Sequence, residues 1–324
     1  MPINLIKMFF LSLKNITPPW TYEDIEKCYF SDFKNIDRDI KDTEGGRLWC
    51  ELESLHECLF IFSSCANDLL DIISNFGHST TKVGFWNSLS NEKQKEYSNN
   101  VKKHLFCSAV SAMALVDHAR KFKRRYPVDE YQSQLKLIFG NDGIHDFIQG
   151  LRNFSSHFQI AETNWQITYE NNVNNVSFLL NKNDLLTWGS WKTSARSFIL
   201  ANDEEINIYY IFSEYIKKTV IFYNWHKYAV ISKYSTTITQ HLTHVKWLGR
   251  VKSKTVWNMI INHIPKDKDP YTYLDKYLTK EQVDDVFSYP YKSKEQIDRL
   301  IKIIDVDEIC DEFMRQKIYL KLAV

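Results

Sequence analysis

The chain has 324 residues, of which 44% are hydrophobic and 25% charged, so it can bury a sizeable core as one large or two modest domains. Its formal net charge of +1 excludes a global positive field as the means of attracting nucleic acid, so any RNA contact must rely on a local patch. Only nine Gly and seven Pro residues occur, which favours long helices over many short strands.

The N-terminal residues predict short helices. Residues 3–13 hold a short apolar run without a small-residue cleavage site, which indicates an amphipathic helix rather than a signal sequence. Thr-Pro-Pro-Trp at 17–20 ends this helix, and residues 21–42 predict a second helix or a helical pair. No apolar run is long enough to span a bilayer, so we expect a cytoplasmic protein that does not bind membranes.

Two long helices give the strongest patterns in the chain. Gly45-Gly46 predicts a break, after which residues 47–76 repeat Leu, Ile and Phe every third or fourth position. Residues 77–90 are expected to form a loop. A second long helix is expected from Asn91 to Arg125, and a shorter one over residues 128–139.

Cysteine usage indicates a reducing compartment. The six cysteines form no Cys-x-x-Cys pair and no regular framework. Cys58 and Cys65, seven residues apart among apolar neighbours, are expected at buried helix positions. Reduced thiols in a cytosolic protein follow from this pattern.

Residues 142–158 predict a helix that carries the candidate functional residues. Its apolar residues recur every three or four positions and define one buried face. Asp142 or Gly143 is a suitable start, and Asp146 in the first turn suits the helix dipole. The apolar positions are Ile144, Phe147, Ile148, Leu151, Phe154 and Phe158.

Polar side chains of this helix gather on one edge. Asn153 and His157 are four residues apart and therefore lie one turn above each other. Arg152 lies beside them, and its long stem can bring the guanidinium towards the imidazole or, across a two-fold axis, towards a second copy. A cation, an amide and an imidazole on one edge form a compact set for handling phosphate.

The chain after this helix contains the only clear β signal. Residues 165–170 and 176–180, with an Asn-rich tip between them, predict a β-hairpin within 164–181. An isolated hairpin is marginally stable, so it should pack on the helical bundle or on a partner's motif helix. Helical patterns resume near Asp184 and from residue 204 to 234.

The C-terminal residues predict a helical accessory region. A helix is expected over residues 235–264, a charged linker over 265–270 and a further amphipathic helix over 293–322. The expected organisation is therefore an N-terminal helical segment (1–45), a helical bundle with the hairpin (46–234) and the accessory region (235–324).

Arg152-Asn153-Phe154-Ser155-Ser156-His157 resembles the signature of the HEPN superfamily, in which Arg, usually followed by a polar residue, precedes His on a late helix of a small helical bundle. The resemblance covers roughly residues 46–230, with the preceding helices matched only in pattern. It implies an all-α, HEPN-like bundle, here with one inserted hairpin and a C-terminal helical extension.

The resemblance implies a metal-independent endoribonuclease without a cofactor, in which the 2′-hydroxyl of RNA attacks its own phosphate. His157 would be the general acid or base, and Arg152 the phosphate clamp. Asn153 would orient the imidazole or the phosphate, and Ser156 would assist by hydrogen bonding. Because family members build their cleft from two motif helices, a homodimer through this helix is implied. Bacterial defence or toxin-type growth control, with an antitoxin or companion subunit, is also implied.

Single-stranded or loop RNA is the expected substrate, since unstacked bases can rest on aromatic rings such as Phe158, Trp165 and Tyr169. A basic cluster at the end of the second long helix has two explanations. Cations suit a helix C-terminus, and they can also track RNA phosphates if this end lies beside Arg152. The cluster's candidate contacts are Lys121, Lys123, Arg124 and Arg125.

Three alternatives stay open. The chain can be a non-catalytic HEPN-like module that recognises a nucleotide, RNA or protein. Arg152 can be held by an acid of the first long helix, with Glu57 as one candidate. His241 and His244 are three apart and could share a metal with His226 or His263, but no Cys or carboxylate completes a recognised set, so no metal site is assigned. Walker, dinucleotide, nucleophile-elbow and zinc-protease motifs are absent from the sequence.

Overall fold

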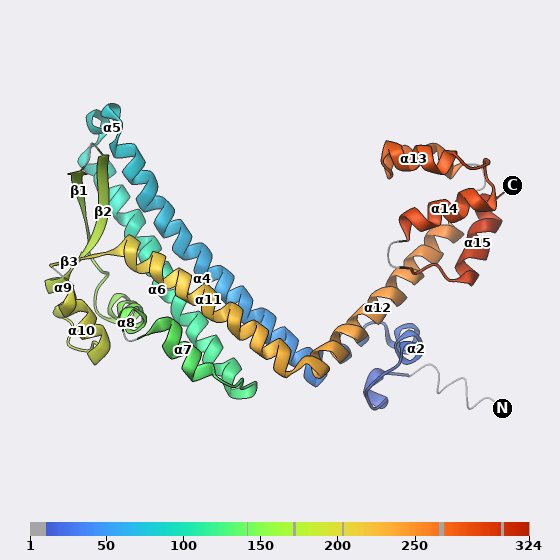
Figure 1. The fold of residues 1–324 in the computed structure, drawn as a ribbon, viewed down its shortest axis with the longest axis horizontal. Coiled ribbons are helices and arrows are strands. Elements are labelled where there is room, and N and C mark those ends of the chain that lie inside the picture. Colours follow the sequence, from blue (N-terminus) through green and yellow to red (C-terminus); the bar gives the residue numbers. More distant parts are fainter. Residues whose placement is uncertain are drawn as a thin grey trace. The chain divides into compact units, whose positions relative to one another are not determined.

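A computed structural model describes residues 11–140, 142–170, 173–202, 204–265, 269–305 and 308–323. The chain divides into two compact units, which we call the bundle unit (47–235) and the terminal unit (residues up to 46 and from 236). Helices dominate both units, and the expected all-α class with an inserted β-hairpin is confirmed (Figure 1). The two ends of the chain therefore belong to one unit.

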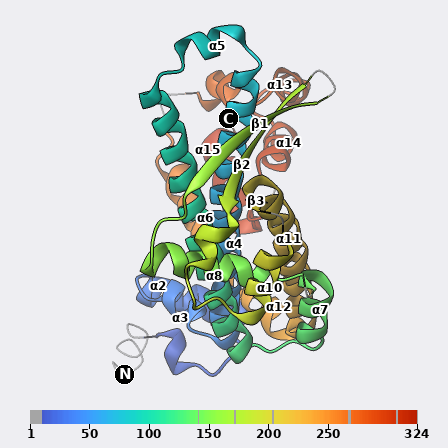
Figure 2. The same ribbon diagram turned by 90° about the vertical axis from the view of Figure 1, so that its left-hand side faces the viewer.

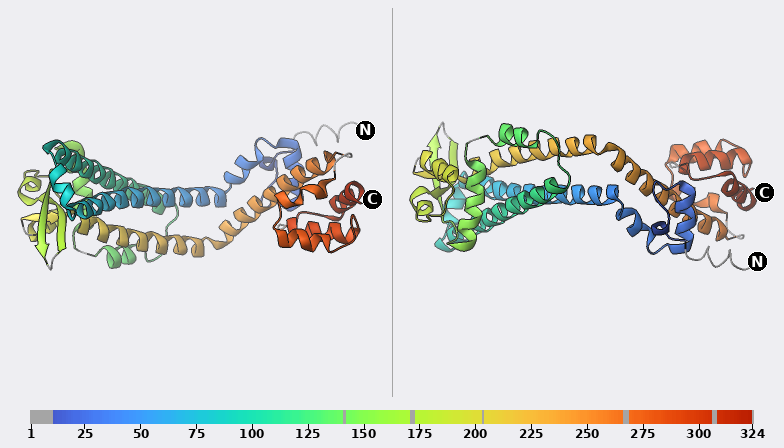
Figure 3. Two further views of the ribbon diagram at one scale, coloured as in Figure 1. Left: turned by 90° about the horizontal axis from the view of Figure 1, so that it is seen from above. Right: turned by 90° about the horizontal axis from the view of Figure 1, so that it is seen from below.

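Three long helices build the bundle unit, and both views of Figure 3 show them running alongside one another. Their contacts are direct: the Ser108 hydroxyl donates to the Cys65 carbonyl at 3.0 Å, and the rings of Phe62 and Tyr215 lie 5.6 Å apart. Leucine, isoleucine, alanine and phenylalanine at helical spacing fill the space between them. These helices are α4 (Glu44–Thr80), α6 (Asn91–Arg125) and α11 (Ile208–Lys233).

The beginning of α4 corrects one expectation. Gly45 and Gly46 lie inside its first turn and do not interrupt it. A Cβ atom on Gly46 would lie 2.5 Å from the Ile40 carbonyl oxygen, and one on Gly45 would lie 2.3 Å from that of Thr237. The two glycines therefore allow other backbone segments to approach the helix closely.

The loop expected at residues 77–90 is also wrong. Helix α4 continues to Thr80, and a short helix α5 (Val83–Ser88) follows. The Trp86 indole N–H donates to the Thr80 carbonyl at 2.8 Å, which links α5 to the end of α4. Helix α6 then starts where expected, although its cap is Ser90, whose hydroxyl accepts from the Lys93 amide.

The predicted motif helix is confirmed as α8 (Ile144–His157), which follows α7 (Tyr131–Phe139). Its apolar positions up to Phe154 are buried as expected, whereas Phe158 lies one residue beyond the helix and is 50% exposed. Helix α8 packs between α6 and α10 (Thr193–Ala201).

A small antiparallel sheet completes the bundle unit, in the order β1 (Thr163–Glu170), β2 (Val173–Asn181) and β3 (Glu205–Asn207). Trp165 pairs with Phe178 across the hairpin, and both rings contact Phe76 of α4 at 5.4 and 5.3 Å. The hairpin thus packs on its own bundle (Figure 2), with β1 against α6 and β2 against α11 and the short α9 (Lys182–Leu186). Strand β3 was not expected, because residues 204–234 share one helical pattern.

The terminal unit contains two small cores. Leu13, Trp20, Ile25 and Ile40 pack with Leu248 in one of them, and a second forms among the C-terminal helices. The expected helical pair at 21–42 is present. The helices are α2 (Tyr22–Asp32), α3 (Ile36–Lys41), α12 (Ser235–Asn262), α13 (Lys280–Phe287), α14 (Lys294–Ile304) and α15 (Glu312–Leu322), with 3-10 turns at Leu13–Asn15 and Pro270–Lys276.

The single helix expected at 293–322 is wrong. The chain leaves α14 at Asp305, whose carboxylate accepts the backbone N–H groups of Ile309 and Cys310, each at 2.7 Å. These bonds tie residues 309 and 310 to the end of α14. The amphipathic helix expected at 3–13 falls mostly on residues 1–10, which lie outside the described residues. No helix in the described ranges combines the length and apolar character that crossing a bilayer requires.

Candidate functional site

Helix α8 is anchored by an aromatic stack, which fixes the orientation of its outer edge. The rings of Phe147 and Phe154 lie 5.6 and 5.8 Å from the Trp191 ring, with interplanar angles of 9° and 23°. The Trp191 indole N–H donates to the Leu185 carbonyl at 2.7 Å and holds the ring in place. With this face buried, residues 152, 153, 156 and 157 project from the other half of the helix.

Arg152 is half-buried, and its Nη1 donates to the Asn153 Oδ1 at 2.9 Å. No carboxylate pairs with Arg152 within the described chain. The acids of α4 have other roles: Glu51 pairs with Arg125, and Glu53 lies 4.0 Å from Lys227. Glu57 is exposed and does not hold Arg152. Asn153 therefore orients Arg152.

His157 and Ser156 are both exposed in the last turn of α8. Arg152 and His157 are five residues apart, which separates them by about 140° around the helix and ~7.5 Å along it. The two side chains thus lie towards opposite margins of the outer half of α8 rather than on one edge. The principal pockets of the described residues are lined by side chains other than Arg152, Asn153 and His157.

Of the three aromatic residues considered for base stacking, Phe158 is available. It is 50% exposed and follows His157 directly. Trp165 is committed to the hairpin's contact with Phe76. The side chain of Tyr169 lies outside the described residues.

The basic cluster lies near the other end of α8. Lys123 and His145, at the start of α8, line one pocket, whereas Glu162, beyond its end, pairs with Lys102 much earlier in α6. The two ends of α8 therefore lie against different segments of α6, and the cluster is not beside Arg152. Within the cluster, Lys121 and Arg124 are exposed.

A pocket beside His145 was not foreseen from the sequence. It has a volume of about 150 Å³ and is lined by residues of α6, α7, α8 and α11, among them Lys123 and Tyr215. The His145 Nδ1 lies 3.0 Å from the Tyr215 hydroxyl, and burial lowers the pKa of His145 below its ordinary value. Four helices meet here, so no local sequence pattern could have indicated it.

Asp146 ties α8 to the segment that leads into α10. Its carboxylate accepts hydrogen bonds from Ser194 and, at 3.1 Å, from Lys192. Burial acts to raise the pKa of Asp146, but these hydrogen bonds outweigh it and lower the pKa. We assign these residues a structural role.

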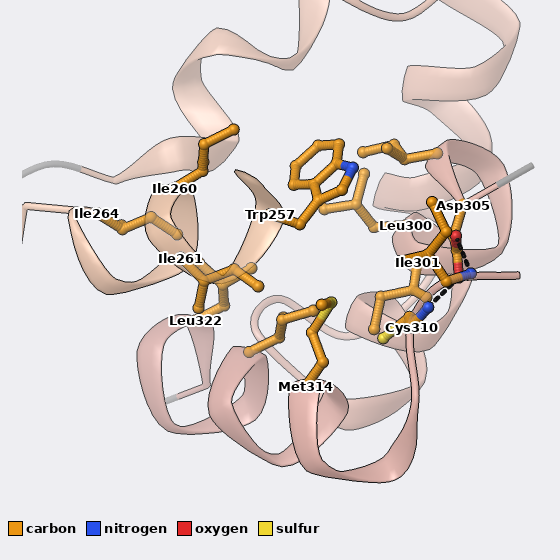
Figure 4. Close-up of a pocket in the computed structure, with 13 residues that line it drawn as sticks. Trp257, Ile260, Ile261, Ile264, Leu300, Ile301, Asp305, Cys310, Met314 and Leu322 are labelled. Atoms are coloured by element: carbon orange, nitrogen blue, oxygen red, sulfur yellow. Dashed lines mark hydrogen bonds between the residues drawn. The ribbon is translucent and has the colours of Figure 1, made fainter. Parts of the chain in front are cut away.

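An apolar recess in the terminal unit has no reactive group to offer. Side chains of α12, α14 and α15 line it, and Figure 4 shows Trp257, Leu300 and Met314 around the opening. Its carboxylate, Asp305, is engaged by backbone N–H groups. Burial raises the pKa of the Cys310 thiol, which keeps it protonated and unreactive.

The histidines considered for a metal site have other surroundings. His244 contacts the Trp20 ring at 5.1 Å, and His226 is enclosed by Phe122 and Tyr131. Within the described residues, no group of three His, Cys, Asp or Glu side chains is placed to hold a metal ion. All six thiols are free, and Cys58 and Cys65, expected to be buried, are half-buried.

Comparisons with known proteins identify no relative: no family model, no curated protein and no solved structure matches the chain.

Proposed function

We propose that the protein is a metal-independent endoribonuclease of the HEPN type, acting as a homodimer through α8. One observation supports this most: the guanidinium of Arg152 and the imidazole of His157 project from the outer half of a helix whose inner half is firmly anchored. In the described chain neither side chain is paired with a carboxylate. Both are therefore free to meet a phosphodiester.

In the proposed reaction the ribose O2′ forms a bond to phosphorus and the P–O5′ bond breaks. A neutral imidazole removes the proton from the 2′-hydroxyl, and an imidazolium delivers a proton to the departing O5′. Arg152 donates to the non-bridging oxygens as their charge grows in the transition state. The Asn153 carbonyl holds the guanidinium, which leaves the Asn153 amide N–H groups and the Ser156 hydroxyl to bind phosphate or ribose oxygens.

A second copy of the chain completes this site. The proton is removed on one side of the phosphorus and delivered on the other, so two imidazoles serve the reaction better than one. Each described chain supplies one Arg152 and one His157, and neither residue lines its principal pockets. Pairing two α8 edges about a two-fold axis brings two such sets to one cleft.

RNA with unstacked bases is the proposed substrate, and Phe158, next to His157, offers a ring for stacking. Lys121 and Arg124 remain predicted phosphate contacts, at a distance from Arg152 and His157. A role in bacterial defence or toxin-type growth control, with an antitoxin or companion subunit, belongs to the same proposal.

The test is RNA cleavage by the purified full chain in EDTA. We expect wild-type protein to cut total RNA, and Arg152→Ala and His157→Ala to lower the rate by at least about a hundredfold. Matched controls are His118→Ala and Arg196→Ala, which remove an exposed side chain of the same type elsewhere in the bundle unit. Cleavage that persists in both motif variants would remove this site from the proposal.

The alternative function is a non-catalytic HEPN-like module that recognises a nucleotide, RNA or protein. The hydrogen bond from Arg152 to Asn153, which already uses one donor of the guanidinium, favours it. No cleavage by any variant, combined with RNA binding that Arg152→Ala weakens, would support the module over the nuclease.

A further inference from the structure

The pocket beside His145 combines the volume of a small ring with a positive rim. Its volume is about 150 Å³, a size at which apolar protein cavities accept benzene. Arg120 and Lys123 of α6 line it, and Arg120 is exposed, which places it at the opening. Aromatic side chains of α7 and α11, including Tyr131 and Tyr223, form its walls. No carboxylate is among the lining residues.

The charge of Arg120 acts on the tyrosine hydroxyls that line the pocket. Burial raises the pKa of Tyr131 to about 12, and the positive charge of Arg120 opposes that rise. Burial likewise raises the pKa of Tyr223, again opposed by Arg120. Two acids act on this region. Asp117 lies 3.3 Å from Arg120, but both side chains are more than half exposed, so this ion pair is weak. The charge of Asp146 acts on His145 and Tyr215, but its carboxylate is engaged by Lys192 and Ser194, so the rim formed by Arg120 and Lys123 stays positive.

Lys123 adds a second cation. Its Nζ lies 4.5 Å from the centre of the Tyr131 ring, and it forms no ion pair within the described chain. The two cations lie one turn apart on α6, since residues three apart share a face of a helix. They can therefore bind the same anionic group.

Two tyrosine hydroxyls are available to a ligand in this pocket. Tyr131 and Tyr223 line it, and neither hydroxyl forms a hydrogen bond within the described residues. His145 adds a further polar group, because its Nδ1 pairs with Tyr215 and its Nε2 stays available.

We propose that this pocket binds a nucleoside monophosphate, with the base among the aromatic walls and the phosphate on Arg120 and Lys123. A base supplies donors and acceptors for the Tyr131 and Tyr223 hydroxyls and for His145, in addition to a planar ring. Inorganic phosphate would leave the aromatic walls unused, and an uncharged nucleoside would leave the cations unused. None of the residues of the proposed cleavage site lines this pocket, so the inference does not rest on nuclease activity.

Isothermal titration calorimetry on the full chain tests the proposal, with AMP, GMP, CMP and UMP as ligands and adenosine, inorganic phosphate and benzoate as probes. We expect at least one monophosphate to bind once per chain. Adenosine and phosphate should bind at least about tenfold more weakly. No binding of any monophosphate at millimolar concentration, or tighter binding of benzoate, would overturn the proposal.

Variants locate the binding. Arg120→Ala and Lys123→Ala should each weaken it about tenfold, and Tyr223→Phe, which keeps the ring, should weaken it a few-fold. Lys103→Ala, an exposed lysine earlier on α6, and Arg196→Ala are matched controls and should stay within twofold of wild type. An equal loss in Lys103→Ala and Lys123→Ala would show non-specific attraction and contradict the site. Arg152→Ala should bind as wild type, so the result is independent of the nuclease assay.

Discussion

His226 is completely buried in the bundle unit, and its burial makes the stability of the fold depend on pH. The side chain is 0% exposed and is surrounded by the rings of Phe122, Tyr131 and Phe222. Neither ring nitrogen has a hydrogen-bond partner within the described residues. Burial, with a smaller contribution from the charge of His56, lowers the pKa of His226 to about 4.

Stability should therefore fall in acid. The unfolded chain binds this proton at about pH 6.5 and the folded chain at about 4, so stabilisation that is complete above pH 6.5 is lost as the pH falls towards 4. At pH 5 the loss from His226 is about 2 kcal/mol. Urea unfolding at pH 7 and pH 5 measures it. His226→Phe should lose about 2 kcal/mol less than wild type between these pH values, while His118→Phe should match wild type; equal losses in all three proteins would contradict the assignment.

For Asn153, the spacing of residues along the helix predicted the position of the side chain but not its hydrogen-bond partner. Four residues separate Asn153 from His157, which correctly places both on the outer side of α8. Asn153 nevertheless accepts a hydrogen bond from the adjacent Arg152, whose long side chain reaches it. Spacing predicted the face that these residues share, but not the partner that each of them binds.

The position of α8 as an element depends on close packing at Gly150. A Cβ atom there would lie 2.4 Å from Cζ3 and 2.5 Å from Cε3 of Trp191. Trp191 in turn stacks on Phe147 and Phe154 and is held by its bond to Leu185. Gly150 thus lets the ring lie flat on the helix.

Gly150→Ala should destabilise the protein by about 1–2 kcal/mol. Displacing Trp191 costs roughly 1–3 kcal/mol, and the better helix propensity of alanine returns up to about 1 kcal/mol of this. Gly77→Ala is the matched control, because it also lies in a helix of the bundle unit and meets nothing closer than 3.9 Å. The control should be neutral or stabilising in urea unfolding. If Gly150→Ala is as stable as the control, Trp191 can move aside without loss of stability, which would contradict this prediction.

The elements that sequence predicted well are those with long, regular apolar spacing. Helices α4, α6 and α8 have this property, and the structure contains all three. Strand β3 has three residues and precedes α11 directly, so its residues fall within the helix that the sequence predicts over 204–234. The glycine pair at 45–46 predicted a break because glycine disfavours helix interiors. In the structure the two glycines instead permit close contact with other backbone segments, which only the tertiary structure reveals.

At the scale of the whole molecule, the proposed activity requires two chains. We expect a sedimentation mass twice the 38.5 kDa of one chain. Ser156→Arg, on the exposed side of α8, should shift the protein towards the monomer and lower cleavage together with dimerisation, since the larger side chains would clash where the two α8 helices meet. Ser232→Arg, at an exposed serine of α11, is the control and should leave the mass unchanged. Full cleavage by a monomeric Ser156→Arg protein would contradict the two-chain site.

Long-range arrangement was the least predictable level. The pocket beside His145 draws residues from four helices, and the terminal unit joins residues from both ends of the chain. Neither arrangement leaves a local pattern, because packing between distant segments decides it.

The most direct test of the central claim is the chemistry of the RNA ends produced. Mass spectrometry of a short RNA oligonucleotide, incubated with wild-type protein in EDTA, should find 2′,3′-cyclic phosphate and 5′-hydroxyl ends. The same sequence with 2′-O-methyl groups should stay intact, and His157→Ala should leave the RNA uncut. Cleavage of the 2′-O-methyl oligonucleotide, or products with 5′-phosphate ends, would contradict attack by the 2′-hydroxyl and with it the role assigned to α8.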